Sequence, residues 1–221
     1  HAYSGSYVKT RSAQQYREVY DIVHPNQQIE VPRGLKISPF YSREERLGAV
    51  FFESGGWERP QWYATNESLL RHEGQNWPNR TGWPARYWSP IIGAEHRAAR
   101  NRVVMFDSTP FTKLEVTGIG ALPFIQGITA NDVDRPYGTV TYTAMLTHSG
   151  GIKCDLTVAR LKEDRFLIVT GGGLGMHDQA WIRSHVPDDG TVQVSDVTGA
   201  LCCVSVWGPR ARDLMKLVSD N

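Results

Sequence analysis

The sequence has little cysteine and no long apolar run. Its 221 residues include three Cys, of which Cys202 and Cys203 are adjacent, and none of them forms a CxxC pair. Adjacent cysteines are poorly placed for an ordinary disulfide, and the lack of CxxC pairs argues against zinc and thioredoxin-like sites. The apolar runs are far shorter than the roughly 20 residues of a membrane-spanning helix, and no signal peptide opens the chain. These features predict a reducing compartment, a bacterial cytoplasm or a mitochondrial matrix, without membrane attachment.

Charge of one sign and the common motifs of catalysis are also scarce. The formal net charge is +1 and the basic residues are dispersed, which argues against a nucleic-acid partner. No HxH, HExxH or GxSxG pattern occurs, so neither a metal site nor a hydrolase triad is predicted. "VTGIGALPF" has Pro123 where the dinucleotide fingerprint needs its third glycine, and "VTGGGLGMHD" lacks the Walker lysine. We interpret the second cluster, Gly171 to Gly175, as a permissive turn, although a ligand close to the backbone would also explain it.

Residues 1–88 read as one segment of mixed character. "RSAQQYREVYDIV" opens with a capping-box pattern at Ser12 and Gln15 and predicts a short helix that ends before Pro25. Residues 31–90 then hold five of the seven Trp residues among repeated Pro and Gly. Apart from one strand over 47–53, we expect ordered coil that wraps a neighbouring domain, because exposed Trp rings are costly in water.

From Ser89 the pattern becomes regular. Ser89 and Pro90 suit the start of a helix over about 90–107. The alternation of apolar and polar residues predicts strands at 111–118, 139–147, 151–161, 165–173 and 200–208, and helices near 120–127, 174–186 and 209–220. Neighbouring strands joined by short turns predict an α+β fold: a largely antiparallel sheet with flanking helices, preceded by the irregular Trp-rich segment.

Asp155 is an unexpected carboxylate in the middle of the strand "GIKCDLTVARL". On spacing alone, an acid on the solvated face of the strand is slightly favoured over a carboxylate at the floor of a pocket. The register of the hairpin decides whether Tyr142 can join it. If Leu146 pairs with Ile152, Tyr142 faces away from Asp155, whereas a register one residue shorter places both side chains on one face.

Several motifs together resemble a known family. "RVVMFDSTPFTKLEVTGIGALPFIQGITANDV", "GTVTYTAMLTHSGGIKCDLTVARL" and "VSVWGPRARDLM" resemble the folate-binding aminomethyltransferases of the glycine cleavage T-protein type. "YREVYDIVHPNQQ" and "LKISPFYSREERLGAVFFESGGWERPQWY" resemble the central segment of dimethylglycine and sarcosine dehydrogenases and oxidases, which join an FAD module to a T-protein-like module. This resemblance implies two parts: residues 1–88 as a central-like segment and residues 89–221 as the first part of the folate-binding domain.

The resemblance also implies a site and its ligands. Tetrahydrofolate is the expected cofactor, with Asp155 as the catalytic carboxylate beside the folate nitrogens. Phe111, Tyr142, Val169 and Gly171 are expected to line the same pocket. FAD is expected in an oxidoreductase module of the same or a partner chain and not in these residues. T-proteins usually have two consecutive acids in this strand, whereas Cys154 precedes Asp155 here, on the apolar face by alternation.

The favoured hypothesis is therefore a fragment of a folate-linked, demethylating oxidoreductase of the dimethylglycine or sarcosine type. Its module would pass a one-carbon unit to tetrahydrofolate to give 5,10-methylenetetrahydrofolate. Two alternatives stay open: a stand-alone aminomethyltransferase of glycine cleavage, and a non-catalytic folate-binding or interaction module.

Overall fold

The chain divides into two compact units. The computed structural model describes residues 4–72 and 77–220, and unit 1 comprises residues 1–107 and 204–221, whereas unit 2 comprises residues 108–203. Within the described residues, no helix is both long enough and apolar enough to cross a membrane. All three cysteines are free thiols.

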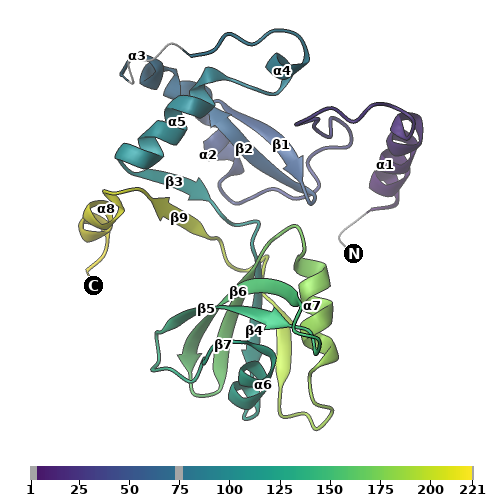
Figure 1. Ribbon diagram of the computed structural model, residues 1–221, viewed down its shortest axis with the longest axis vertical. Helices are drawn as coiled ribbons and strands as arrows, with labels where there is room; N and C mark the ends of the chain where they lie inside the picture. Colours follow the sequence, from purple (N-terminus) through teal and green to yellow (C-terminus); the bar gives the residue numbers. More distant parts are fainter. Residues whose placement is uncertain (1–3, 73–76, 221) are drawn as a thin grey trace. The chain divides into compact units, whose positions relative to one another are not determined.

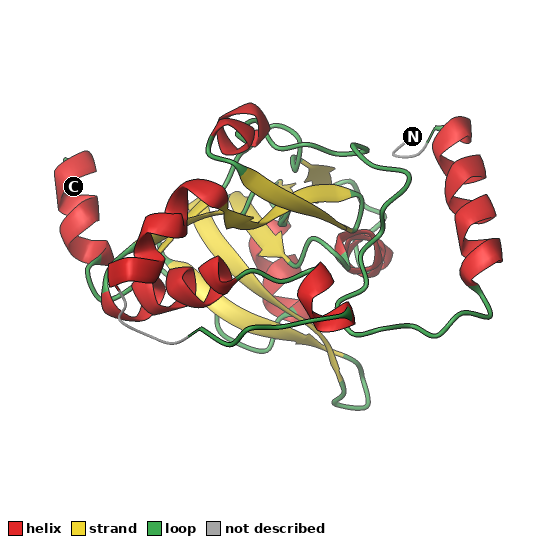
Figure 2. Ribbon diagram, turned by 90° about the horizontal axis from the view of Figure 1, so that it is seen from above, coloured by secondary structure: helices red, strands yellow, loops and turns green. Residues whose placement is uncertain are grey.

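Unit 1 contains short helices and two separate antiparallel strand pairs, β1 with β2 and β3 with β9 (Figure 1). Figure 2 shows α1 next to the N-terminus, joined to the rest of unit 1 by a long loop. The elements are α1 (Gly5–Glu18), α2 (Tyr41–Arg46), β1 (Ala49–Ser54), β2 (Trp57–Tyr63), the 3-10 helix η1 (Ala64–Ser68), α3 (Leu69–His72), α4 (Trp83–Arg86), α5 (Pro90–Asn101), β3 (Val104–Asp107), β9 (Val204–Trp207) and α8 (Ala211–Val218).

Two helices of unit 1 differ from the prediction. The first begins before Ser12, because the Ser4 side chain caps it by accepting from the Tyr7 N–H at 3.2 Å. The helix at Pro90 begins as expected, with Ser89 as its N-cap, but it ends at Asn101. Residues 104–107 are a strand, since Val104–Asp107 pairs with a distant partner, Val204–Trp207, that local periodicity does not reveal. The Trp-rich segment also holds more regular structure than the single strand expected.

Unit 2 is a five-stranded antiparallel sheet with two helices, in the order β5-β6-β7-β4-β8. The α+β prediction is confirmed. Only β8 was not predicted from the sequence. The elements are β4 (Thr112–Thr117), α6 (Ala121–Ile128), β5 (Val140–Leu146), β6 (Ile152–Lys162), β7 (Arg165–Thr170), α7 (Gly175–Ser184) and β8 (Gln193–Asp196).

Both helices of unit 2 pack on one face of the sheet. Phe124 and Ile125 of α6 and Ile182 of α7 share a core with Leu114 and Phe166 of the strands. Side chains alternate along a strand, so the residues between these core positions point to the opposite face. Within residues 108–203, all of which are described, neither helix contributes to that second face, which we call the open face.

Candidate functional site

A bulge in the β5–β6 hairpin places Tyr142 and Asp155 on the same side of the sheet. Leu146 pairs with Ile152, as in the first expected register, but the register shifts by one residue before Met145 pairs with Cys154. Beyond the bulge Tyr142 pairs with Thr157, as the shorter register requires. The Tyr142 hydroxyl donates a hydrogen bond to Asp155 Oδ2 at 2.7 Å.

The residues predicted for the folate site lie in two neighbouring rows across the open face. One row is formed by paired residues of neighbouring strands and runs Tyr142, Thr157, Val169, Lys113. In the next row on that face Ala144 pairs with Asp155. Extending the registers of β6, β7 and β4 by one residue beyond their last pairs, both with Thr170, aligns Gly171 and Phe111 with Asp155. The strand registers thus put Tyr142, Asp155 and Val169 on one face of the sheet, and the extended registers put Gly171 and Phe111 beside them.

Side chains on this face are exposed around Asp155. Tyr142 is 66% exposed and Phe111 is 40% exposed, and Asp155 is also exposed. No atom lies within 4 Å of the place that a Cβ on Gly171 would take. Among the described residues, Asp155 Oδ1 accepts no hydrogen bond. A flat, nitrogen-rich ring can therefore lie over Thr157 and Gly171 and donate to the carboxylate.

Cys154 has no part in this face. It packs against the core, and burial, with Asp178 nearby, raises the pKa of its thiol to about 11. The thiol is therefore neutral near pH 7. This placement confirms the prediction from alternation, and it leaves Asp155 as the acid that the strand presents on the open face.

The glycine cluster after β7 is explained by close packing. A Cβ on Gly172 would lie 2.0 Å from the Pro110 carbonyl oxygen, and one on Gly175 would lie 1.8 Å from Thr112 Oγ1. Neither glycine has a positive φ. The cluster lets the β7–α7 loop approach the segment that carries Phe111, which is a packing reason for the permissive turn.

Two residues of the rows, Lys113 and Thr157, were not predicted. Thr157 follows Asp155 by two positions, so the period of a strand could have placed it on the same face. The burial of Lys113 could not be predicted from the sequence, because a lysine in an alternating strand is normally solvated. In the structure this residue is only 3% exposed.

The bond between Tyr142 and Asp155 gives a spectroscopic prediction. The hydrogen bond to Asp155 and its negative charge raise the pKa of the Tyr142 phenol. Substituting Asp155→Asn removes the negative charge and leaves only a weaker, neutral amide acceptor, so we expect the pKa of the Tyr142 phenol to fall toward the usual value of about 10. Titration of the Tyr142 ring carbon by NMR measures it, with Asp134→Asn as a control that leaves the midpoint unchanged. Equal midpoints in the wild type and Asp155→Asn would show that the bond does not form in solution.

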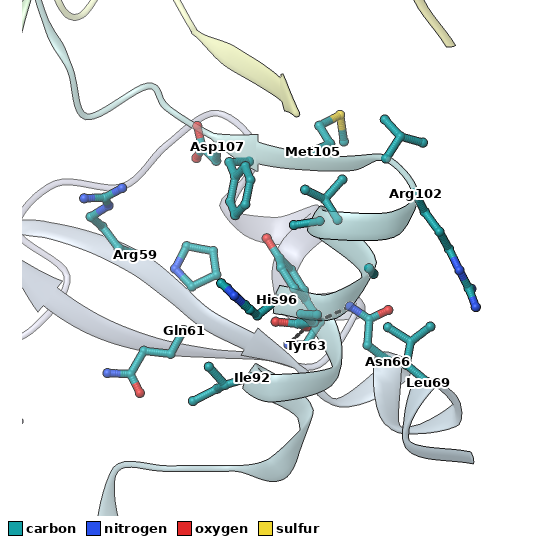
Figure 3. A pocket seen from close by; sticks show the side chains of 17 residues that line it. Arg59, Gln61, Tyr63, Asn66, Leu69, Ile92, His96, Arg102, Met105 and Asp107 are labelled. Atoms are coloured by element: carbon teal, nitrogen blue, oxygen red, sulfur yellow. Dashed lines mark hydrogen bonds between the residues drawn. The ribbon is translucent and has the colours of Figure 1, made fainter. Parts of the chain in front are cut away.

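Unit 1 contains a separate pocket of about 560 Å³ between β2, α5 and residues 102–107 (Figure 3). Within it, Glu95 Oε1 accepts from the Tyr63 N–H at 3.0 Å and from Asn66 Nδ2 at 2.7 Å. Behind the lining, the Tyr63 hydroxyl donates to Glu44 Oε1 at 3.0 Å. Burial raises the pKa of both carboxyl groups, Glu44 and Glu95. The named polar groups of this pocket mostly bond to one another, which is typical of a structural network.

Glu44 gives unit 1 a specific pH dependence. Its residue is 6% exposed, and its raised pKa means that the folded state holds the proton to a higher pH than the unfolded state. Its stabilising contribution is therefore present below the unfolded pKa of about 4.3 and is lost as pH rises through the folded pKa. The free energy of unfolding of Glu44→Gln, minus that of the wild type, should therefore increase between about pH 4 and pH 7.

Chemical denaturation followed by tryptophan emission measures this difference, because six of the seven Trp residues lie in unit 1. Glu67→Gln, at an exposed position, is the control and should follow the wild type at both pH values. If the free energies of unfolding of Glu44→Gln and the wild type changed equally with pH, the raised pKa of Glu44 would be contradicted.

Comparisons with known proteins identify the family of the chain. The family model described as GCVT N-terminal domain matches residues 40–221. The chain belongs to this family. Residues 1–38 match a second model, the FAD dependent oxidoreductase central domain. The resemblance inferred from the sequence motifs is thus confirmed, and the boundary between residues 88 and 89 stays a prediction.

The similar curated proteins include amine oxidases or dehydrogenases and aminomethyltransferases. The chain is 34% identical to the 4-methylaminobutanoate oxidase (formaldehyde-forming) of Paenarthrobacter nicotinovorans, over 100% of the chain and 26% of that protein. It is 29% identical to the human mitochondrial dimethylglycine dehydrogenase, over 84% of the chain and 21% of that protein. It is 31% identical to the aminomethyltransferase of Geobacillus thermodenitrificans, over 84% of the chain and 44% of that protein. The chain thus spans between about a fifth and less than half of these relatives.

A solved structure supports the fold. The glycine cleavage system aminomethyltransferase T from Bartonella henselae aligns with 83% of this chain and 43% of its own, at a TM-score of 0.60 and 23% identity. At this identity the likeness shows the fold alone. Among the described residues, no group of three or more His, Cys, Asp or Glu side chains is placed to hold a metal ion.

Proposed function

We propose that this chain carries the folate-binding face of an enzyme that demethylates N-methyl amines, of the dimethylglycine or sarcosine type. The observation that carries the proposal is the pair of rows on the open face, where Asp155 lies among Tyr142, Val169, Gly171 and Phe111. Membership of the GCVT family, together with relatives named as dehydrogenases, an oxidase and an aminomethyltransferase, supports it.

The residues present suit tetrahydrofolate. Asp155 offers a carboxylate oxygen to ring or amine nitrogens, and a hydrogen bond to a charged group contributes about 1.5–3 kcal/mol. Tyr142 and Phe111 provide aromatic surfaces at the two ends of the rows, and Gly171 leaves room between them. When bound, tetrahydrofolate supplies the nitrogens that accept a one-carbon unit as 5,10-methylenetetrahydrofolate.

Asp155 would act by its charge and by accepting a proton. A carboxylate fixed by the Tyr142 hydroxyl stabilises positive charge near its free oxygen Oδ1 without reorganising. The same oxygen can take a proton from an attacking nitrogen. Tyr142 holds Asp155 Oδ2, so the direction of the free oxygen is set before any ligand binds.

The partner that makes the reactive carbon is proposed to be an FAD-dependent oxidoreductase module, of the same or another chain. The match of residues 1–38 to the central domain of such proteins supports this arrangement. It also favours the demethylating enzyme over a stand-alone aminomethyltransferase of glycine cleavage. The expected compartment is a bacterial cytoplasm or a mitochondrial matrix.

Isothermal titration with tetrahydrofolate tests the proposal. The wild-type chain should bind, and Asp155→Ala should weaken the affinity at least about tenfold, the equivalent of 1.4 kcal/mol. Asp134→Ala, an exposed acid away from the two rows, is the control and should bind as the wild type does. Equal heats for the wild type and Asp155→Ala would overturn the role of Asp155, and binding without dependence on it would favour a non-catalytic folate module.

A further inference from the structure

Lys113 is a buried cation at the end of a row on the open face. It pairs with Val169 across β4 and β7, and the residue is 3% exposed. Its ammonium donates to the backbone carbonyl oxygens of Thr109 at 2.8 Å and Phe111 at 2.9 Å. The side chain therefore folds back along its own strand toward the segment that precedes β4.

These two bonds add to the contacts that hold the segment before β4. The Ser108 N–H donates to the Cys203 carbonyl at 2.9 Å, and the Cys203 N–H donates to Thr109 Oγ1 at 3.2 Å. Phe111 is the last residue before β4, and its own N–H donates to the Ser108 carbonyl at 3.0 Å. Lys113 thus ties the carbonyls on both sides of Pro110 to the sheet.

A contribution to folding stability is not enough to explain why a lysine occupies this position. Removing an ammonium from water carries a large desolvation cost, and the bonds to these two carbonyls offset part of it. Apolar side chains of similar size often replace buried charges with no loss of stability. What an apolar side chain cannot do is fix two carbonyl groups in direction, and these carbonyls determine where Phe111 lies.

We infer that Lys113 is a positioning residue that holds Phe111 at the edge of the folate-binding face. Phe111 ends the row that contains Asp155 and Gly171, so its placement sets the width available to a flat ring. The inference rests on the proposed function in one respect only, the identity of the ligand. The contact between Lys113 and the Phe111 segment can be measured without any ligand.

The first test is a double-mutant cycle on tetrahydrofolate affinity. Lys113→Met keeps the length of the side chain and loses its donors, and it should raise the Kd about tenfold. Phe111→Ala should also raise the Kd about tenfold. The double variant should bind no more weakly than Phe111→Ala alone, because residues that act through one contact are not additive. Lys162→Met, at an exposed position of β6, is the matched control and should leave the Kd unchanged.

The second test is hydrogen exchange in the absence of ligand. In Lys113→Met the amide of Phe111 should exchange at least about tenfold faster, while the amides of Phe166 and Ile168 in the core stay at wild-type rates. Lys113→Arg, which retains charge and donors, should restore most of the protection. If Lys113→Met does not fold, protection of Phe111 in Lys113→Arg decides the question: protection near the wild-type level supports the inference, and loss of it contradicts it.

The two tests separate the inference from the proposed function. If the wild type does not bind tetrahydrofolate, the proposed function fails for this chain, and hydrogen exchange alone decides the role of Lys113. Additive losses of affinity in the double variant, or unchanged exchange of the Phe111 amide in Lys113→Met, would overturn the role of Lys113 even where folate binds.

Discussion

Replacing Gly172 with alanine is expected to lower the free energy of unfolding of unit 2 by about 3 kcal/mol. The added Cβ would lie 2.0 Å from the Pro110 carbonyl oxygen and 2.8 Å from its carbonyl carbon, and both are backbone atoms. Backbone cannot rotate away as the end of a long side chain can, so the β7–α7 loop or the Pro110 segment must shift. Phe111 follows Pro110 directly, and the same substitution should therefore weaken tetrahydrofolate binding.

Native-state hydrogen exchange of the Ile168 amide reports this loss, because Ile168 lies in the fully buried core of unit 2. Gly173→Ala is the matched control. Nothing lies within 4 Å of a Cβ at Gly173, and its φ is not positive, so its effect should stay within about 0.5 kcal/mol. Equal stabilities for the two variants would mean that the loop does not approach Pro110 as closely as described.

Replacing Thr157 with arginine is expected to weaken tetrahydrofolate binding at least about thirtyfold, the equivalent of 2 kcal/mol. Thr157 lies between Tyr142 and Val169 in its row, and its neighbours on β6, Leu156 and Val158, face the core. A long side chain here covers the centre of the open face. Its guanidinium also reaches Asp155, two residues away on the same side, and competes for the carboxylate.

This substitution should leave the fold intact, since it adds volume on the side of the sheet that carries no core. Ile119→Arg, at a position that is 87% exposed in the turn before α6, is the control and should bind tetrahydrofolate as the wild type does. Isothermal titration of both variants measures the effect. Unchanged affinity in Thr157→Arg would place the ligand elsewhere.

Local alternation predicts most of the strands of unit 2, because each strand buries one face and exposes the other. The register of the β5–β6 hairpin was not predictable in the same way. Its bulge lies between the pairs Leu146–Ile152 and Met145–Cys154, and one extra residue reverses the face on which Tyr142 lies. Hydrophobic spacing allowed both registers, and the structure uses a part of each.

The elements that depend on distant partners were harder to predict. Residues 104–107 continue a helical pattern from Pro90, yet they form a strand because Val204–Trp207 offers a ladder about 100 residues later. The role of Lys113 likewise depends on carbonyl groups that only the folded segment before β4 presents. The carboxylate and the aromatic residues of the site came from recognisable motifs, whereas the contacts that position them required the structure.

The central claim is that tetrahydrofolate lies on the open face of unit 2, over the two rows that contain Asp155. Amide chemical-shift mapping by NMR during titration of the wild-type chain with tetrahydrofolate tests this claim most directly. We predict that the largest shifts occur at Tyr142, Asp155, Thr157, Val169 and Gly171, and that the amides of α6 and of unit 1 around Glu95 change little. Shifts concentrated in the unit 1 pocket or on α6 and α7, with Asp155 and Tyr142 unchanged, would contradict the account.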